Sequence, residues 1–531
     1  MKRPVFVLLV LIAMFASVPL RMIYLIAEKE TFPDVSNSLR SVVLSEQRGE
    51  IYDRNMKKLV NRKSENTVVA LPAEQSAEIL EDYINREEYV RLLEAIERKE
   101  IFVCQCDFRE ENDFVKVAEN FERYTDDGFC SHVVGYINTS DNEGVYGIEK
   151  SFDKFLTEDE NKLVFEYNRS GNNDFLAGGK NGFVSQNGNS RKGVRLTIDY
   201  DVQRIAENAM RLYGIEKGAA VVMSAKSGEI IAMASAPCFN QNDIQSALDD
   251  ESSPFVNRAL SSYSVGSVFK LVVAAAAIEA GEDNFESYCS GSLKIGTTTF
   301  SCSNGTAHGK TTLENAFAHS CNTYFIRLAL KTGSEKILRM AENLGFGKGF
   351  SLAEGFDASS GNLPDSIYTD GMLANLSFGQ GGLLATPLQI ASCYSAAVNG
   401  GTFIEPELVR SLVSADGTET VSDENRYKYR ALSPDDSEKL KNLLINNFTT
   451  GTCVPAKPEG CPAGGKTSTA QTGWIDKNGE EILHSWFSGF VECDNEIYTI
   501  TVFKEDGASG SMDCGPVFKE ISQRLCGIMC K

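Results

Sequence analysis

The 531-residue sequence is poor in histidine and in basic residues. It has four histidines, and its 52 lysines and arginines are outnumbered by 73 aspartates and glutamates, for a formal net charge of −21. A nucleic-acid partner needs a basic surface to match its phosphates, so this charge balance argues against nucleic-acid binding. The acidic residues form no long run, which indicates a solvated surface rather than an acidic tail.

Paired C-x-x-C motifs are also missing, although the chain has 14 cysteines. With so few histidines and such scattered cysteines, we expect no zinc site, and no other metal or cofactor. Disulfides are the usual use of cysteine in an exported chain, whereas a reducing habitat would leave the thiols free. The sequence leaves these two states open.

One long apolar stretch stands at the N-terminus, over residues 5–27, and Lys2 and Arg3 precede it. Its length suits a hydrocarbon core of about 30 Å, and the two cations place the short end in the cytoplasm. We therefore expect a cytoplasmic tail (1–4), a single transmembrane anchor (5–27) and an extracytoplasmic remainder at the cell membrane. A cleaved signal peptide is the alternative, but no small-x-small site follows the stretch.

The rest of the chain divides at a segment rich in Gly, Asn and Ser, residues 168–193. We interpret this segment as a linker between a module at 28–167 and a domain at 194–531. In the first module, residues 41–44 and 67–70 have strand-like patterns. Apolar residues at helical spacing predict one amphipathic helix over 74–100.

The domain at 194–531 has strand patterns at both ends and helical patterns between them. Residues 194–199 alternate like a strand, 200–213 predict a helix, and 218–223 with 229–234 predict a hairpin. Strand patterns return at 486–492 and 497–503, before a helical stretch at 517–529. This order predicts a mixed α/β (α+β) fold in which N- and C-terminal strands join in one antiparallel sheet.

Ser267 and Lys270 are the candidate nucleophile and base. They begin an apolar helical run, three residues apart and therefore on one face. Burial would lower the pKa of the lysine and favour the neutral amine, and N–H groups at the helix start could stabilise an oxyanion. The alternative is that Ser267 only caps the helix and Lys270 reaches solvent, since Ser151 and Lys154 have the same spacing.

Two further motifs follow in order, Ser320-Cys321-Asn322 and Lys466-Thr467-Ser468-Thr469. With Ser267-x-x-Lys270 they resemble the three motifs of the penicillin-binding protein and serine β-lactamase superfamily. The literal Lys-Thr-Gly at 331–333 is rejected, because it ends an apolar helical run where Gly333 makes a natural stop. Ser468 stands where the family has glycine.

The resemblance covers most of residues 40–160 and 190–505. Segments at 48–55, 132–136, 144–149, 152–156, 378–381 and 386–389 are similar to class B, monofunctional penicillin-binding proteins. The resemblance implies an elongated, dimerisation-like pedestal at 28–167. It also implies a penicillin-binding transpeptidase domain at 194–531, with a central antiparallel sheet flanked by helices.

The resemblance also implies a role for each residue. Ser267 would be the nucleophile, Lys270 the base, Ser320 a proton relay and Asn322 a ligand of the substrate amide. Lys466 would neutralise the substrate carboxylate beside the hydroxyls of Thr467 and Thr469. The N–H groups of Ser267 and Thr469 would form the oxyanion hole, and Ser468 would border the substrate. Arg48, Asp53 and Arg54 are expected to be structural ion-pair residues that join the pedestal to the anchor, and the four histidines to be packing residues.

The implied activity is D,D-transpeptidation of peptidoglycan through a serine acyl-enzyme. Stem peptides ending in D-Ala-D-Ala would be the substrates, and β-lactams would acylate the same serine. No glycosyltransferase segment is recognisable, so a separate membrane glycosyltransferase of the SEDS type is the implied partner. A D,D-carboxypeptidase, a β-lactamase and a β-lactam sensor remain as alternatives.

Overall fold

The computed structural model describes residues 11–12, 14–21, 24, 39–158, 161–169, 175, 181–186, 192–421 and 427–529. The expected tail 1–4, about half of the expected anchor and most of the linker 168–193 lie outside the described residues. The chain divides into two compact units. Unit 1 comprises Met1–Gln47, Ser64–Phe121 and Glu160–Gly188, and unit 2 comprises Arg48–Lys63, Glu122–Asp159 and Asn189–Lys531.

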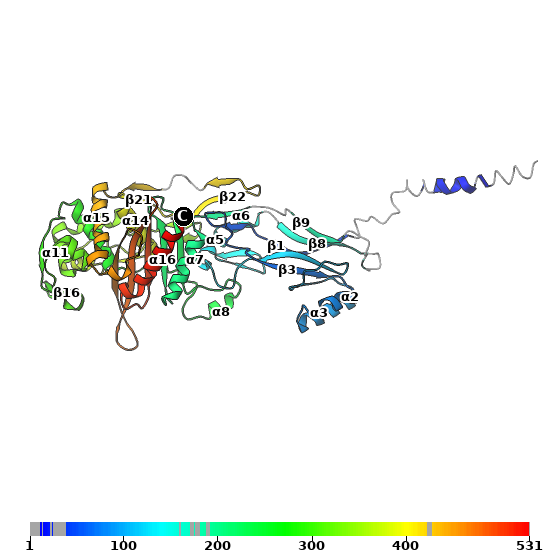
Figure 1. Cartoon of the computed structure of the whole chain (residues 1–531), viewed down its shortest axis with the longest axis horizontal. Helices are drawn as coiled ribbons and strands as arrows, with labels where there is room; N and C mark the ends of the chain where they lie inside the picture. Colours follow the sequence, from blue (N-terminus) through cyan, green and yellow to red (C-terminus); the bar gives the residue numbers. More distant parts are fainter. Residues whose placement is uncertain are drawn as a thin grey trace, which may run out of the picture. The chain divides into compact units, whose positions relative to one another are not determined.

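Unit 1 contains two small sheets and a helical pair. Its strands β1 (Leu39–Gln47), β8 (Asn161–Asn168) and β9 (Gly182–Gln186) form one antiparallel sheet (Figure 1). The other sheet has the order β4-β3-β5, with bounds Phe102–Gln105, Lys63–Ala70 and Val115–Glu122. Strand β9 lies inside the segment that the sequence indicated as linker. Its Phe183 packs on Phe165 of β8 with ring centroids 5.2 Å apart, a tertiary contact that composition does not report.

The single helix expected over 74–100 is wrong, because this region forms two helices, α2 (Glu74–Leu80) and α3 (Arg86–Glu97). Asn85 begins the second helix with a capping box. Its side chain accepts from the Glu88 N–H at 2.9 Å, and the Glu88 carboxylate accepts from the Asn85 N–H at 3.4 Å. This reciprocal cap fixes a new helix start inside an otherwise continuous apolar period.

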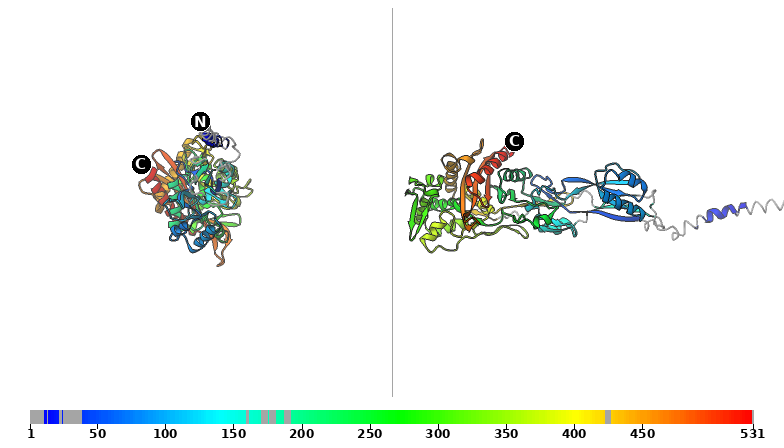
Figure 2. Two further views of the ribbon diagram at one scale, coloured as in Figure 1. Left: turned by 90° about the vertical axis from the view of Figure 1, so that its right-hand side faces the viewer. Right: turned by 90° about the horizontal axis from the view of Figure 1, so that it is seen from below.

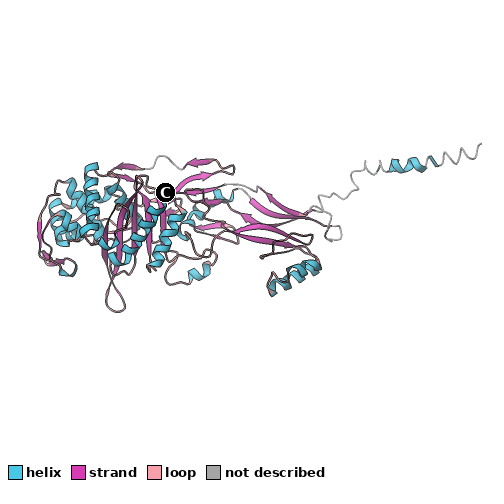
Figure 3. Cartoon of the chain, viewed as in Figure 1, coloured by secondary structure: helices cyan, strands magenta, loops and turns pink. Residues whose placement is uncertain are grey.

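Unit 2 is built on a five-stranded sheet of order β12-β11-β27-β26-β25, antiparallel throughout. Strands are magenta and helices cyan in Figure 3. The strands are β11 (Gly218–Ser224), β12 (Ile230–Ala236), β25 (Ala463–Ile475), β26 (Glu481–Cys493) and β27 (Glu496–Lys504). The pairing of β11 with β27 confirms that strands from the two ends of this domain join in one sheet. The strand predicted at 194–199 is not part of that sheet, because β10 (Gly193–Leu196) pairs with β2 (Glu50–Tyr52) and β22 (Val409–Val413) instead.

Alternating side chains give the sheet two apolar faces. Ala220, Val222, Ile500 and Val502 pack with helices α7 (Tyr200–Leu212) and α16 (Gly515–Met529) in one core. Val221, Met223 and Phe503 pack with α9 (Lys270–Glu279) and α14 (Pro387–Val398) in the other. Helix α16, coloured red, lies along the sheet (Figure 1, Figure 2). The period of two in each strand therefore accounts for helices on both faces.

Helix α9 is buried on every side, from Lys270 to Ile278, as its run of Ala and Val predicts. A 3₁₀ turn, η2 (Gly266–Phe269), precedes it, so Ser267 lies in a tighter turn than the α-helix expected from sequence. The other helices of unit 2 include α10 (Leu313–Ala318), α11 (Asn322–Thr332), α12 (Ser334–Asn343), α13 (Asp370–Leu376) and α15 (Pro434–Thr450).

Segments 48–63 and 122–159 of the expected pedestal pack within unit 2. The buried Arg48 contacts Glu149 at 3.1 Å and Asp153 at 2.9 Å, and Arg54 contacts Glu229 at 3.1 Å. The carboxylate of Asp53 accepts from the N–H of Tyr200 at 3.1 Å. Arg48 and Arg54 thus form ion pairs, as expected, whereas Asp53 accepts hydrogen bonds from main-chain N–H groups. These contacts connect residues within unit 2, and the expected link to the anchor stays a prediction.

Residues 11–12, 14–21 and 24 of the expected anchor are helical. Within the described residues, none of the helices combines the length and the apolar character needed to cross a membrane.

Candidate active site

The three motifs of the sequence meet around one cleft in unit 2, with a cavity volume of about 560 Å³. Six of the eight predicted site residues line it: Ser267, Ser320, Asn322, Thr467, Ser468 and Thr469. The other two, Lys270 and Lys466, are fully buried, with 0% exposure of either residue. The cleft therefore has hydroxyl and amide groups on its wall and two lysine amines behind it.

Gly266 lets the Ser267 turn approach strand β25. Its φ of +63° lies in the left-handed region. A Cβ at this position would come within 2.3 Å of the Ser468 side-chain oxygen and 3.0 Å of the Ala470 side chain. Only glycine fits both requirements at this position. The conformation places Ser267 next to β25, half-exposed at the cleft.

Three oxygen atoms surround the amine of Lys270. Its Nζ lies 2.8 Å from the Ser320 carbonyl oxygen, 3.0 Å from Ser320 Oγ and 2.7 Å from Asn322 Oδ1. Ser320 has a φ of +55°, an uncommon value for serine, and this conformation turns both of its oxygens toward the amine. The second motif is thus bonded to the first through the lysine.

Burial lowers the pKa of Lys270 well below its ordinary value, and the nearby positive charge of Lys466 lowers that pKa further. Both effects favour the neutral amine over the ammonium. A neutral amine has a lone pair, to which the hydroxyl of Ser320 can donate across the 3.0 Å contact. This contact gives a path for a proton between the two side chains.

Lys466 lies on the edge strand β25, where the sequence placed the third motif. Its Nζ donates to the Thr467 carbonyl oxygen at 3.2 Å, and burial lowers its pKa to about 8. The Thr467 hydroxyl contacts that of Thr452 at 2.8 Å, and Thr469 Oγ1 accepts from the Gly510 N–H at 3.3 Å. The rejected Lys331-Thr332-Gly333 instead ends helix α11, as predicted.

Ser468 contacts the Ser267 N–H, a donor that the family resemblance implies for the oxyanion hole. Its Oγ accepts from the backbone N–H of Ser267 at 2.6 Å and donates to the Val265 carbonyl oxygen at 3.0 Å. In this structure the Ser267 N–H therefore donates to Ser468, whereas the resemblance implied that it would donate to the substrate. A glycine at position 468 would have no side chain to make this contact.

Sequence reasoning missed a backbone group that orients Asn322. The Asn322 side-chain amide donates to the Ser301 carbonyl oxygen at 2.9 Å while its Oδ1 accepts from Lys270. This contact determines which end of the amide faces the lysine. No side-chain motif reports it, because the acceptor is a main-chain carbonyl.

The four histidines have different surroundings. His132 is buried with a ring nitrogen 2.7 Å from the Pro254 carbonyl oxygen, and His484 packs against Tyr263. His319 is exposed at the cleft, and His308 lies beside Cys289. Two of the four therefore lie at or near the site.

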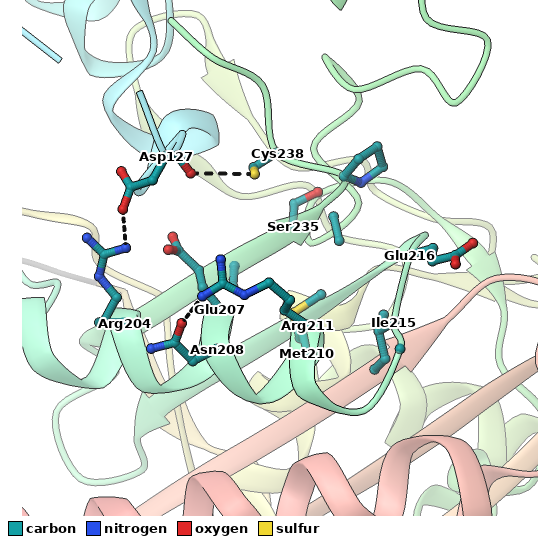
Figure 4. A pocket seen from close by; sticks show the side chains of 14 residues that line it. Asp127, Arg204, Glu207, Asn208, Met210, Arg211, Ile215, Glu216, Ser235 and Cys238 are labelled. Carbon is teal, nitrogen blue, oxygen red and sulfur yellow. Dashed lines mark hydrogen bonds and ion pairs between the residues drawn. The ribbon is translucent and has the colours of Figure 1, made fainter. Parts of the chain in front are cut away.

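A second cavity of about 410 Å³ in unit 2 holds none of the predicted site residues. It is lined by Arg204, Glu207 and Arg211 of α7 and by Cys238, near the Asp127–Arg204 ion pair (Figure 4). Cys238 Sγ donates to the Asp127 carbonyl oxygen across 3.9 Å. The chemistry of the three motifs thus belongs to the first cleft.

Comparison with known proteins agrees with this geometry. Residues 218–523 match the penicillin binding protein transpeptidase domain. Stage V sporulation protein D of Bacillus subtilis (strain 168) is 29% identical, over 97% of this chain and 83% of the relative. Peptidoglycan D,D-transpeptidase PbpA of Mycolicibacterium smegmatis is 30% identical, over 59% of this chain and 67% of the relative.

One solved structure has a TM-score of 0.72 with this chain. It is described as "Structural coordination of polymerization and crosslinking by a peptidoglycan synthase complex". It is 23% identical and covers 98% of both chains, which shows a shared fold. The chain therefore belongs to the penicillin-binding protein transpeptidase family, and within that family to the class B proteins.

Proposed function

We propose that this protein is a peptidoglycan D,D-transpeptidase that forms its acyl-enzyme on Ser267. The observation that carries the proposal is the bonding of the buried Lys270 amine to Ser320 and Asn322 at the cleft that Ser267 lines. An amine with a lowered pKa and a hydroxyl relay is what an unactivated serine needs in order to attack a carbonyl.

Substrate binding would use the edge strand β25. This strand ends the sheet order, so a stem peptide can add to it by main-chain hydrogen bonds. The protonated Lys466 would attract the terminal carboxylate, and the hydroxyls of Thr467 and Thr469 line the same cleft. Asn322 would contact the peptide amide.

Acylation would begin when Ser267 Oγ attacks the carbonyl carbon of the penultimate D-alanine. Its proton passes to the neutral Lys270 amine, and the C–N bond to the last D-alanine breaks. Ser320 can return the proton to the leaving amine, because its hydroxyl contacts the same Nζ. An acceptor amine then attacks the ester and loses its proton to the Lys270 amine. The ester C–O bond breaks, and Lys270 returns the proton to Ser267 Oγ.

Penicillin should form a long-lived adduct on Ser267 of the full-length chain in detergent, because a bound β-lactam blocks the step that releases the serine. We expect the intact-protein mass to rise by the mass of the drug and a peptide map to place it on Ser267. The Ser267→Ala variant should show no adduct.

Ser151→Ala is the matched control, since Ser151 has the same Ser-x-x-Lys spacing and donates to the Gly147 carbonyl oxygen. An adduct that survives Ser267→Ala would contradict the assignment. Rapid turnover of the drug by the native chain would indicate a β-lactamase instead.

The rate of penicillin acylation should fall as pH rises through about 8, because Lys466 has a pKa of about 8 and loses its charge there. Below that pH the ammonium remains and can pair with the drug's carboxylate. The test is the second-order acylation rate constant as a function of pH. Penicillin methyl ester, which lacks the carboxylate, should not show this decline, and equal declines for both compounds would contradict the role of Lys466.

Replacing Ser468 should speed acylation, because its hydroxyl occupies the Ser267 N–H. One oxyanion-hole donor is worth about 100- to 1,000-fold in rate, so we expect Ser468→Gly to raise the acylation rate constant about tenfold or more. Ser468→Ala separates the hydroxyl from the Cβ and should give a similar gain if the hydroxyl is responsible. A loss of rate in both variants would show that Ser468 assists the reaction.

The proposed location is the outer side of the cell membrane, with residues 5–27 as a single anchor. This proposal rests on the apolar stretch, on the cations before it, and on exposed apolar side chains at Leu11, Phe15 and Leu20. A membrane glycosyltransferase, of the SEDS type by resemblance, is the proposed partner.

The chain should sediment with membranes after an alkaline wash, and a form with residues 5–27 replaced by a cleavable signal peptide should be released by that wash. Retention of the second form would assign membrane attachment to another part of the chain.

A further inference from the structure

Three cysteines and one histidine converge behind the active-site turn. They are Cys289, which ends β14 (Ser287–Cys289), Cys302 after β16 (Thr298–Ser301), His308 before β17 (Gly309–Thr311), and Cys321. Their ligand atoms all lie within 4.8 Å of one another, and all four residues belong to unit 2. Their spacing in sequence is irregular, so no C-x-x-C pair marks the cluster.

The distances fit a tetrahedral metal centre. Cys289 Sγ lies 3.7 Å from Cys302 Sγ, Cys302 Sγ lies 3.8 Å from Cys321 Sγ, and Cys289 Sγ lies 3.3 Å from His308 Nδ1. Zinc–sulfur bonds of about 2.3 Å in a tetrahedron place two sulfurs roughly 3.8 Å apart. We propose that Cys289, Cys302, His308 and Cys321 bind one structural Zn²⁺ ion.

The chemistry of the ligand set selects the metal. Thiolate and imidazole donors favour Zn²⁺ over the oxygen-seeking Mg²⁺ and Ca²⁺. Four protein ligands close the coordination sphere, so the ion would hold structure rather than activate water. Binding replaces three thiol protons, which leave to solvent, and gives a centre of net charge −1.

The surroundings suit bound thiolates. The three sulfur-bearing residues are 1%, 3% and 0% exposed, in the order Cys289, Cys302 and Cys321. The Gly291 N–H donates to Cys289 Sγ at 3.4 Å, and the Thr323 hydroxyl lies 3.5 Å from Cys321 Sγ. An odd number of thiols cannot be satisfied by disulfides within the cluster. The one disulfide among the described residues, Cys493–Cys526, lies elsewhere in the sheet and α16.

The ion would fix the catalytic turn from two sides. Cys321 stands between Ser320 and Asn322, the two residues that contact the Lys270 amine. Cys302 follows Ser301, whose carbonyl oxygen accepts from the Asn322 amide at 2.9 Å. Bound zinc would thus hold the positive φ of Ser320 and the orientation of Asn322. The four ligands are positioning residues for the proposed acyl transfer, on which this second claim rests.

Metal content of the full-length chain tests the site without reference to activity. Purified in detergent with a thiol reductant, the chain should contain about one zinc per molecule by elemental mass spectrometry. The Cys302→Ser variant should lose most of the zinc, and so should His308→Ala, in which a half-exposed ligand is replaced. Cys393→Ser, a buried cysteine of α14 outside the cluster, is the matched control and should keep it.

Cobalt chloride added to the zinc-free chain should give the visible absorption of a tetrahedral cobalt–thiolate centre. A zinc-free native chain with reduced thiols, a Cys289–Cys302 disulfide in the peptide map, or full zinc in Cys302→Ser would each overturn the site.

Removal of zinc by a chelator should slow penicillin acylation about tenfold or more, and zinc chloride but not magnesium chloride should restore it. A zinc-free chain that acylates at the native rate would overturn the positioning role. One zinc per chain without a penicillin adduct would sink the proposed function and leave the metal site standing. A penicillin adduct on a native chain that contains no zinc would overturn the metal site and leave the proposed function standing.

Discussion

The burial of the Lys270 amine is the constraint on which the rest of the site depends. A buried amine without polar partners costs several kcal/mol, so the chain must surround it with oxygen atoms. Ser320 and Asn322 supply them, and the Ser301 carbonyl holds Asn322 in turn. The apolar helix α9 that begins at Lys270 buries the amine, and this burial lowers its pKa, as the proposed role of base requires.

Two other features act on the same few residues. Ser468 accepts a hydrogen bond from the Ser267 N–H on the side of β25, and the proposed zinc at the cysteine and histidine cluster would hold the Ser-Cys-Asn turn. The Ser468 contact determines whether the Ser267 N–H is available to a substrate oxyanion. The zinc would position Ser320 and Asn322, the partners of Lys270. A centre that depends on contacts this close needs rigid elements around it, which the sheet and buried helix provide.

The central sheet and the main site residues could be predicted because their signals are local. Strands β11 and β27 are buried on both faces, and Ser267, Lys270, Ser320, Asn322 and Lys466 stand in short motifs. The break between α2 and α3, the pairing of β9 and the Ser468–Ser267 bond could not be predicted in this way. Each depends on a cap or a tertiary contact that neither periodicity nor composition encodes. The meeting of Cys289, Cys302, His308 and Cys321 has the same origin, since loops of irregular length bring them together.

In the proposed function, the Ser267 centre passes an acyl group to an amine. The most direct measurement follows a thioester mimic of a stem peptide with the full-length chain and increasing concentrations of a D-amino acid acceptor. We expect an acyl-enzyme on Ser267 and a product mixture that shifts from hydrolysis to amide formation as the acceptor concentration increases. Hydrolysis alone at every acceptor concentration would overturn the transpeptidase function and identify a carboxypeptidase.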